Sequence, residues 1–151
     1  MKKPIQETTG YMLAQTCRLL RSQIRVLLGE IGLCRGQQFV LHTLWVEEGI
    51  THSELAERLK IRPATVTNML KRMEKAGLVE RRQDTKDQRV SRAYLTGAGL
   101  DIRDAVEETW RELERRAFSG FSSEELDSLS QLLIKIQENL LRKAADDGSQ
   151  T

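Results

Sequence analysis

Residues 51–96 read THSELAERLKIRPATVTNMLKRMEKAGLVERRQDTKDQRVSRAYLT. The segment opens with a capping-box pattern, in which the Thr51 hydroxyl accepts from the Glu54 backbone amide while the Glu54 carboxylate reaches back, so a helix begins here. Pro63 follows a short break and, because proline lacks an amide donor, it marks the start of a second helix. Gly77 supplies a left-handed residue after that helix. The stretch therefore predicts two short helices separated by a tight turn.

A β-hairpin is predicted directly after the second helix. Strand-like runs occur at residues 78–82 and 90–95, and the polar, highly charged residues between them form the tip. Two short helices followed at once by a hairpin are typical of a winged helix-turn-helix. The expected fold class is mainly α with a small β-hairpin (α+β).

Amphipathic helices are also predicted on both sides of this segment. Apolar residues recur at helical spacing over about 9–29, 35–47, 98–118 and 123–141. The helix at 35–47 is expected to turn four residues inward, and these are Phe39, Val40, Leu44 and Trp45. The last helix begins with a second capping box and carries a stripe of leucine and isoleucine. Residues 143–151 are expected to form a flexible tail.

The second helix of the motif has two different faces. With Val66 directed to the core, a step of about 100° per residue places Leu70 and Met73 on the same side. The opposite face and its flanks carry small residues, hydroxyls, an amide and cations, namely Ala64, Thr65, Thr67, Asn68, Lys71, Arg72 and Lys75. An acid-free face of this kind suits the major groove of DNA, where asparagine pairs with adenine and cations contact guanine or phosphate. A solvated helix surface is the alternative interpretation.

The charge distribution favours the DNA interpretation. Residues 58–92 contain eleven Lys and Arg against four Asp and Glu, although the formal net charge of the whole chain is only +2. A basic middle flanked by less basic ends indicates that the middle meets a polyanion.

Other classes of protein fit the sequence poorly. The chain has 151 residues and only two cysteines, which lack metal-ligand spacing, and it has no long apolar run or leader pattern. We therefore expect a cytoplasmic protein with no membrane span, no cofactor and no metal. No phosphate-binding loop or nucleophile-and-base pattern is apparent, so we do not expect an enzyme.

The same segment resembles the DNA-binding core of the multiple-antibiotic-resistance regulator (MarR) family. The matching elements are G-L-x-x-x-Q-x-x-x-L from Gly32, the A-T-V-T-x-x-L-x-R-M-E-x-x-G-L-V block from Ala64, D-x-x-D-x-R from Asp84 and L-T-x-x-G from Leu95. Together they cover residues 30–100, and their order and spacing are specific.

The resemblance implies a homodimeric transcriptional regulator that binds a double-stranded DNA operator. It also implies one domain over 1–145, with a DNA-binding lobe at about 36–96 and dimerisation helices at about 9–31 and 98–142. A small-molecule or redox signal is expected to alter the spacing of the two DNA-contacting helices. Phe39, His42 and Trp45 either line an effector pocket or belong to the core.

The hairpin tip is expected to reach the DNA as well. Its basic residues Lys86 and Arg89 can enter a narrow minor groove, and Arg62 before the second helix can contact a phosphate. The acidic residues Asp84 and Asp87 are interpreted as wing-organising, each able to hold a basic neighbour such as Arg89 or Arg81. The alternative function is a protein-binding winged helix without DNA-binding activity.

Both cysteines are interpreted as inert, partly buried thiols. Some members of the resembling family sense peroxide through a cysteine near the start of their first helix, but Cys17 lies deeper in its helix. Nothing near Cys17 or Cys34 in the sequence lowers a thiol pKa. The two histidines, His42 and His52, have no partner at metal spacing.

Overall fold

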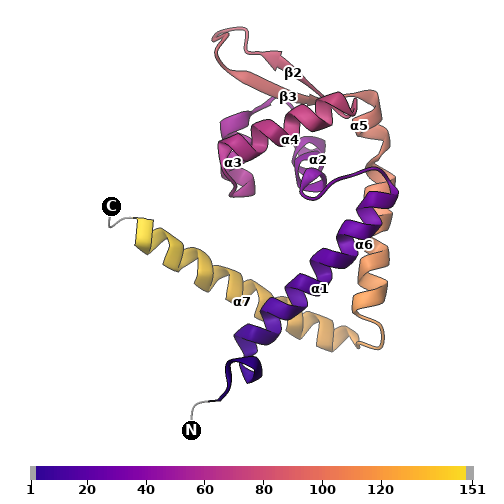
Figure 1. The fold of residues 1–151 in the computed structure, drawn as a ribbon, viewed down its shortest axis with the longest axis vertical. Helices are drawn as coiled ribbons and strands as arrows, with labels where there is room; N and C mark the ends of the chain where they lie inside the picture. Colours follow the sequence, from indigo (N-terminus) through magenta and orange to yellow (C-terminus); the bar gives the residue numbers. More distant parts are fainter. Residues whose placement is uncertain (1–2, 149–151) are drawn as a thin grey trace. The chain divides into compact units, whose positions relative to one another are not determined.

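A computed structural model describes residues 3–148 of the chain and the side chains of residues 3–143 (Figure 1). The chain divides into two compact units, Met1–Leu113 and Glu114–Thr151. The first contains most of the helices and the whole sheet, and the second contains the end of one helix and the long C-terminal helix. A single domain over 1–145 stays a prediction.

The first long helix of the first unit is α1 (Thr9–Glu30). It is preceded by a 3-10 turn at Ile5–Glu7, which was not predicted. The Thr8 side chain caps α1 by accepting from the Tyr11 amide at 3.3 Å. Gly29 lies inside the helix, and the left-handed residue that ends it is Gly32, with φ 79°. A second left-handed glycine, Gly36, then caps α2 (Gln37–Val46).

The helix-turn-helix consists of α3 (His52–Leu59) and α4 (Pro63–Lys75). The predicted capping box is present, with the Thr51 amide donating to Glu54 Oε2 at 2.8 Å and the Glu54 amide donating to Thr51 Oγ1 at 3.2 Å. Pro63 occupies the first turn of α4 as expected. These local signals confirm the start of both helices.

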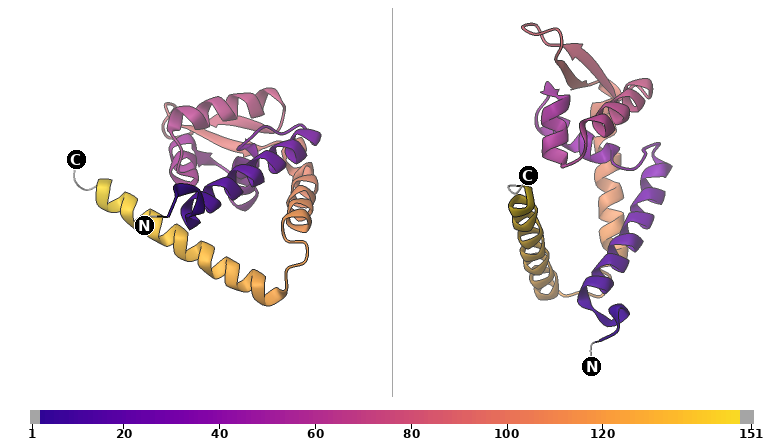
Figure 2. Two further views of the ribbon diagram at one scale, coloured as in Figure 1. Left: turned by 60° about the horizontal axis from the view of Figure 1, so that its bottom comes forward. Right: turned by 60° about the vertical axis from the view of Figure 1, so that its left-hand side comes forward.

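A three-stranded antiparallel sheet follows, with strand order β1-β3-β2. The hairpin strands β2 (Val79–Gln83) and β3 (Ser91–Leu95) lie within one residue of their predicted positions. The third strand, β1 (Ile50–Thr51), was missed because it has two residues and pairs with Ala93 and Arg92, far along the chain. The hairpin projects beyond α3 and α4, as the right-hand view of Figure 2 shows.

The core of the first unit lies between α2, α3, α4 and the sheet. Its fully buried large side chains come from all of these elements and include Leu41, Leu44, Ile50, Leu55, Leu70 and Met73. Phe39 is an exception to the prediction for α2, since half of it is exposed (50%), and the buried positions on that helix include Gln37 and Gln38 instead. Trp45 is half-buried.

The helix predicted at 98–118 is divided into α5 (Gly97–Asp101) and α6 (Arg103–Ala117), with a turn residue at Ile102. Thr96 caps α5, because its hydroxyl accepts from the Gly99 amide at 3.1 Å. The Trp45 indole on α2 donates to the Gly99 carbonyl at 2.9 Å. This bond connects α5 to the buried side of α2.

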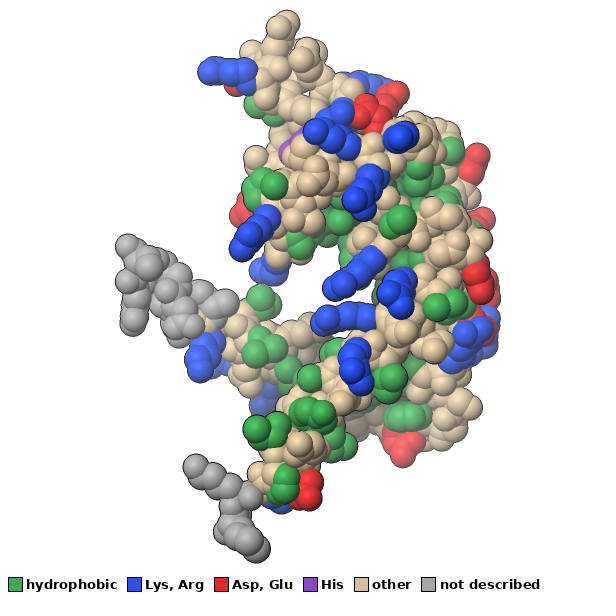
Figure 3. All heavy atoms as spheres, in the orientation of Figure 1, with side chains coloured by type: hydrophobic (Ala, Val, Ile, Leu, Met, Phe, Trp, Pro, Cys, Tyr) green, Lys and Arg blue, Asp and Glu red, His purple; other side chains and the backbone are tan. Residues whose placement is uncertain are grey.

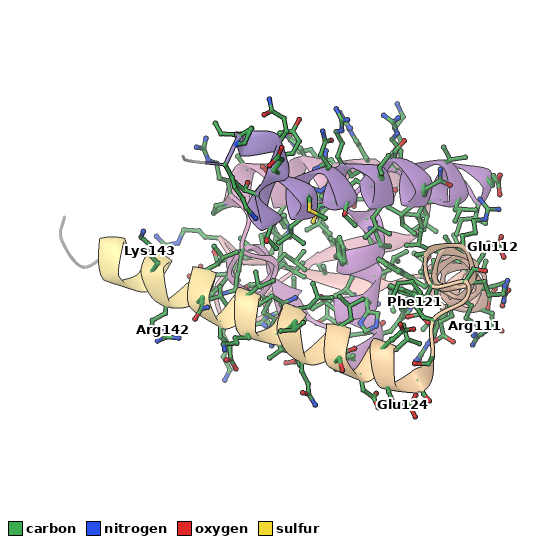
Figure 4. The ribbon with its side chains drawn as sticks, turned by 90° about the horizontal axis from the view of Figure 1, so that it is seen from below. Arg111, Glu112, Phe121, Glu124, Arg142 and Lys143 are labelled. Atoms are coloured by element: carbon green, nitrogen blue, oxygen red, sulfur yellow. The ribbon has the colours of Figure 1, made fainter. Side chains whose placement is uncertain are left out.

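The second unit contains α7 (Ser123–Gly148), which begins with the predicted capping box between Ser122 and Glu125. Figure 4 labels Glu124 at its start, where a negative charge suits the helix dipole, and Arg142 and Lys143 before its last turn, which contains no basic residue. The helix continues to Gly148, beyond the predicted end, and residues 149–151 of the predicted tail lie outside the described residues.

No described side chain of α7 is buried, although the helix carries a long apolar stripe. Leu132, Ile134 and Leu140 are each more than half exposed. Among the described residues, no helix has both the length and the apolar character needed to cross a lipid bilayer.

Candidate functional site

The outer face of α4 is the main candidate site, and its side chains lie as the helical spacing predicted. Val66, Leu70 and Met73 are buried against the core. The predicted contact residues that the structure leaves exposed are Arg62, Ala64, Thr65, Asn68, Lys71 and Arg72. Figure 3 shows Lys and Arg side chains over α4 on the face in view. Basic and amide side chains are thus presented to solvent together.

Thr67 is the predicted contact residue that lies apart from this group. It is half-buried, and its Oγ1 lies 3.5 Å from His52 Nδ1 on α3. Burial lowers the pKa of His52, and the positive charge of Arg81 lowers it further, so this imidazole is neutral near neutral pH. Thr67 therefore lies at the edge of the outer face of α4, where this helix contacts α3.

Asp84 organises the turn of the hairpin tip. Its Oδ1 accepts from the amides of Lys86 at 2.7 Å and Asp87 at 3.1 Å, and its Oδ2 accepts from Arg92 Nε at 2.5 Å. Arg92 also donates to the carbonyl oxygen of Gly49 at 2.7 Å. One arginine thereby ties the tip to the turn before β1.

Arg92 was not among the predicted wing residues. Arg81 was predicted as a possible partner of the wing aspartates at the base of the hairpin, and this prediction was wrong. Arg81 instead pairs with Glu74 of α4 at 2.6 Å. The hairpin register brings Arg92 near Asp84, because it pairs Arg92 with Arg82, two residues before Asp84. The other predicted pairing is present, since Arg89 Nε lies 3.3 Å from Asp87 Oδ1.

The carboxylate of Asp84 gives the wing a pH dependence. Its pKa is lowered from 3.8 to about 2, first by the hydrogen bond from Arg92 and then by the amides of Lys86 and Asp87. Because folding favours the ionised carboxylate, Asp84 contributes fully to the free energy of unfolding at a pH above its ordinary pKa of 3.8. This contribution is lost as the pH falls toward the lowered pKa of about 2.

We expect Asp84→Asn to lower the free energy of unfolding at neutral pH. The difference from the unchanged protein should narrow as the pH is lowered from about 4 toward about 2, where Asp84 itself becomes protonated. Urea unfolding at several pH values measures this difference. Asp127→Asn, the same change on α7, is the control, and a difference that did not vary with pH would contradict the role of Asp84.

A groove of about 550 Å³ in the first unit brings the three predicted effector residues together. Phe39, His42 and Trp45 line it from α2, and Trp110 lines it from α6. The Phe39 and Trp110 rings lie 6.5 Å apart. Trp110 was not predicted, because a single sequence does not show that α6 packs beside α2. The half-exposed Phe39 thus belongs to a groove rather than to the core.

The thiols differ from each other in their surroundings. Cys17 is half-buried, whereas Cys34 is exposed and lines a hollow beside Asn68 and Arg72, so the prediction of partial burial fails for Cys34. Within residues 3–143, no cluster of three His, Cys, Asp or Glu side chains could hold a metal ion.

Comparison with known proteins agrees with this geometry. Residues 33–91 match the model of the MarR family. The chain is 31% identical to the organic hydroperoxide resistance transcriptional regulator of Bacillus subtilis (strain 168) over 134 residues, which are 88% of this chain and 89% of that one. It is 32% identical to the HTH-type transcriptional repressor MdtR of the same organism over 108 residues, or 71% and 69% of the two chains. Among solved structures, a MarR protein from Peptoclostridium difficile superposes with a TM-score of 0.81 at 25% identity, covering 95% of each chain.

Proposed function

Because the chain belongs to the MarR family of transcriptional regulators, we propose that it binds a pseudo-palindromic DNA operator as a homodimer and represses transcription there. Members of this family are regulators and not enzymes, in agreement with the sequence. We propose that it acts in the cytoplasm, where a regulator of this family meets its operator.

The observation that carries the proposal is the outer face of α4. The one acidic residue of this helix, Glu74, is half-buried and paired with Arg81, so the exposed face bears Asn68, Lys71 and Arg72 without a competing carboxylate. Such a face matches the hydrogen-bonding edges of bases and the phosphates that flank them. The wing beside it adds Lys86 and Arg89, whose side chains are exposed.

Dimer formation is supported by apolar surface on the two long helices. Large apolar side chains of α1, including Met12, Leu19 and Val26, are more than half exposed, and α7 has the exposed stripe described above. Exposed apolar side chains that follow one another along a helix are typical of protein interfaces. A twofold dimer would read two half-sites about one helical turn apart.

Regulation by a small molecule is supported by the aromatic groove at Phe39, His42 and Trp45. Its volume lies within the range of small-molecule sites. The repressor role rests on similarity to relatives such as MdtR, which is named as a transcriptional repressor. We propose that an effector in this groove releases the operator.

Retardation of a labelled fragment of the DNA upstream of its own gene, at moderate salt, tests the proposal. Binding with sequence preference supports a regulator of this kind. The alternative, a protein-binding winged helix, predicts no preference over unrelated DNA, and the lack of exposed large apolar side chains on the outer face of α4 weighs against it.

Asn68 and Lys71 should contribute differently to DNA recognition. Asn68→Ala is expected to relax base preference at one operator position at a cost of roughly 1 to 3 kcal/mol. Lys71→Ala should weaken binding to all sequences alike. It should also lower the slope of log affinity against log salt concentration by about one, which corresponds to one counterion fewer released on binding. Binding titrations against a set of single-base operator variants separate the two effects. Unchanged preference in Asn68→Ala would show that α4 is oriented differently on the DNA.

Arg89→Ala should weaken operator binding about tenfold, which corresponds to a loss of 1.4 kcal/mol. The Arg89 side chain is 92% exposed and is held at the tip by Asp87, so little folding stability depends on it. Asp87→Ala should produce a similar loss of affinity, because it frees the guanidinium that must be ordered on the DNA. Thermal unfolding serves as the control, and an unchanged affinity in both variants would leave the tip as a solvated loop.

A further inference from the structure

The threonines that lie beyond the first turn of their helices differ in where they direct the hydroxyl group. In α1, α2 and α6, Thr16, Thr43 and Thr109 each donate to the carbonyl oxygen four residues earlier, at 2.8 to 2.9 Å. Thr67 of α4 forms no such bond among the described residues, and its Oγ1 lies 3.5 Å from His52 Nδ1 of α3 instead. The Thr67 hydroxyl is therefore directed away from its own helix and toward α3.

The imidazole of His52 has few polar neighbours. It belongs to the first residue of α3 and is half-buried, and its Nε2 is buried without a hydrogen-bond partner among the described residues. The charged groups that act on the ring are Arg81 of β2 and Glu74 of α4, and these two pair with each other at 2.6 Å. Within residues 3–143, the Thr67 hydroxyl is thus the one hydrogen-bond partner of the ring.

These neighbours determine which ring nitrogen carries the proton. A neutral imidazole has one N–H group and one bare nitrogen. A proton on Nε2 would leave a buried donor without an acceptor, and such donors are rarer in folded proteins than buried acceptors without a donor. A proton on Nδ1 leaves Nε2 bare and lets Nδ1–H donate to Thr67 Oγ1. The hydroxyl proton of Thr67 is then used neither by its own helix nor by the ring.

We propose that His52 positions Thr67 as a hydrogen-bond donor to the operator. The Nδ1–H group of His52 donates to Thr67 Oγ1, and the Thr67 O–H group is free for an acceptor at the edge of the outer face of α4. His52 does not itself contact DNA and acts only through this hydroxyl. The inference rests on the proposed function and assigns the direction of one of its DNA contacts.

The direction of this hydrogen bond decides which groups of DNA Thr67 can contact. A hydroxyl with a free proton donates to N7 or O6 of guanine, to N7 of adenine, to O4 of thymine or to a phosphate oxygen. If Thr67 donated to His52 Nδ1 instead, its oxygen could only accept, and its base partners would be the amino groups of cytosine and adenine. His52 therefore affects base preference from outside the DNA interface.

The position of the ring proton can be measured without DNA. Protonated and bare imidazole nitrogens differ widely in their ¹⁵N chemical shifts, and the chain has only two histidines, of which His42 is exposed and serves as the internal reference. At neutral pH, His52 should show a protonated Nδ1 and a bare Nε2, and the loss of its signals in His52→Asn assigns the spectrum. A proton on Nε2 of His52 would overturn the proposal.

The same spectrum shows whether the hydroxyl holds the proton on Nδ1. Thr67→Val removes the acceptor at nearly constant side-chain volume and should return the His52 ring to a mixture of its two neutral forms. Thr43→Val is the matched control, because that hydroxyl donates within α2 to Phe39, and it should leave the His52 signals unchanged. An unchanged His52 spectrum in Thr67→Val would count against the proposal.

Operator titrations show whether the ring acts through the hydroxyl. His52→Leu removes the donor and should raise the operator Kd at least about fivefold, whereas His52→Asn, whose side-chain amide can donate from the place of Nδ1, should stay within about twofold. Thr67→Val should lose at least as much affinity as His52→Leu. The double variant should lose no more than Thr67→Val alone, because both changes remove one contact. Additive losses would show that His52 acts independently of Thr67 and would overturn the proposal.

Two controls accompany the titrations. Thr43→Val should bind operator as the unchanged protein does, and urea unfolding of each variant separates a lost contact from a loss of folded protein. If His52→Leu fails to fold, the spectrum of the unchanged protein still decides the position of the proton. Because that spectrum is recorded without DNA, failure of the unchanged protein to bind any operator would count only against the proposed function.

Discussion

Replacing Ile136 with aspartate should separate the proposed homodimer into single chains and weaken operator binding by about a hundredfold or more. Ile136 lies on the apolar stripe of α7, together with Leu129, Leu133 and Leu140. Burying an unpaired carboxylate in an interface costs several kcal/mol, which exceeds what the remaining contacts can offset. A single chain would bind one half-site and lose the gain in affinity that comes from joining two.

Sedimentation at micromolar concentration measures the change in mass, and operator titration measures the loss of affinity. Gln131→Asp is the matched control, because Gln131 is exposed on the polar side of the same helix and gains the same charge. A dimer that persisted in Ile136→Asp would show that the stripe of α7 is not its interface. A monomer in the unchanged protein would remove the homodimer from the proposal altogether.

Gly99→Ala should reduce the free energy of unfolding by about 3 kcal/mol or more. A Cβ at this position would lie 2.1 Å from the carbonyl oxygen of Leu78 and 3.1 Å from Leu95 Cδ2. The Leu78 backbone cannot withdraw easily, because its amide donates to Met73 at 3.0 Å and its carbonyl accepts from Thr96 at 3.1 Å. The clash therefore strains the junction of α4, the hairpin and α5 together.

Gly97→Ala is the control for this prediction, since no atom lies within 4 Å of a Cβ at that position of the same helix. It should leave stability unchanged or raise it slightly, because alanine favours helix over glycine by up to about 1 kcal/mol. Urea unfolding of the two variants gives the comparison. Similar stabilities would mean that α5 shifts freely relative to β2 and β3.

The features that the sequence predicted correctly are those encoded within a few residues of one another. The capping boxes at Thr51 and Ser122 and the proline start of α4 each involve contacts of at most three residues, and all are present. The buried and exposed faces of α4 followed from the helical repeat for the same reason. MarR membership likewise followed from short motifs in a specific order.

The features that were missed depend on contacts between distant residues. β1 exists only because Ile50 pairs with Ala93, and Trp110 joins the aromatic groove only because α6 packs near α2. The Arg92 contacts with Asp84 and Gly49 also depend on the three-stranded sheet being formed. A single sequence contains no local signal for these pairings. The exposure of Phe39 was missed for the same reason. The helical spacing of apolar residues shows that position 39 is apolar, but it does not show whether the side chain faces the core or a groove.

The strand order β1-β3-β2 has a consequence for the biosynthesis of the chain. β3 forms the middle of the sheet and ends at Leu95, so all three strands are available once that residue has left the ribosome. α7 begins at Ser123, and its apolar stripe is therefore translated only after the sheet can close. Since N-terminal units generally fold first during translation, we expect the lobe around the sheet to fold on the ribosome and the proposed pairing of two chains to follow as a later, concentration-dependent step.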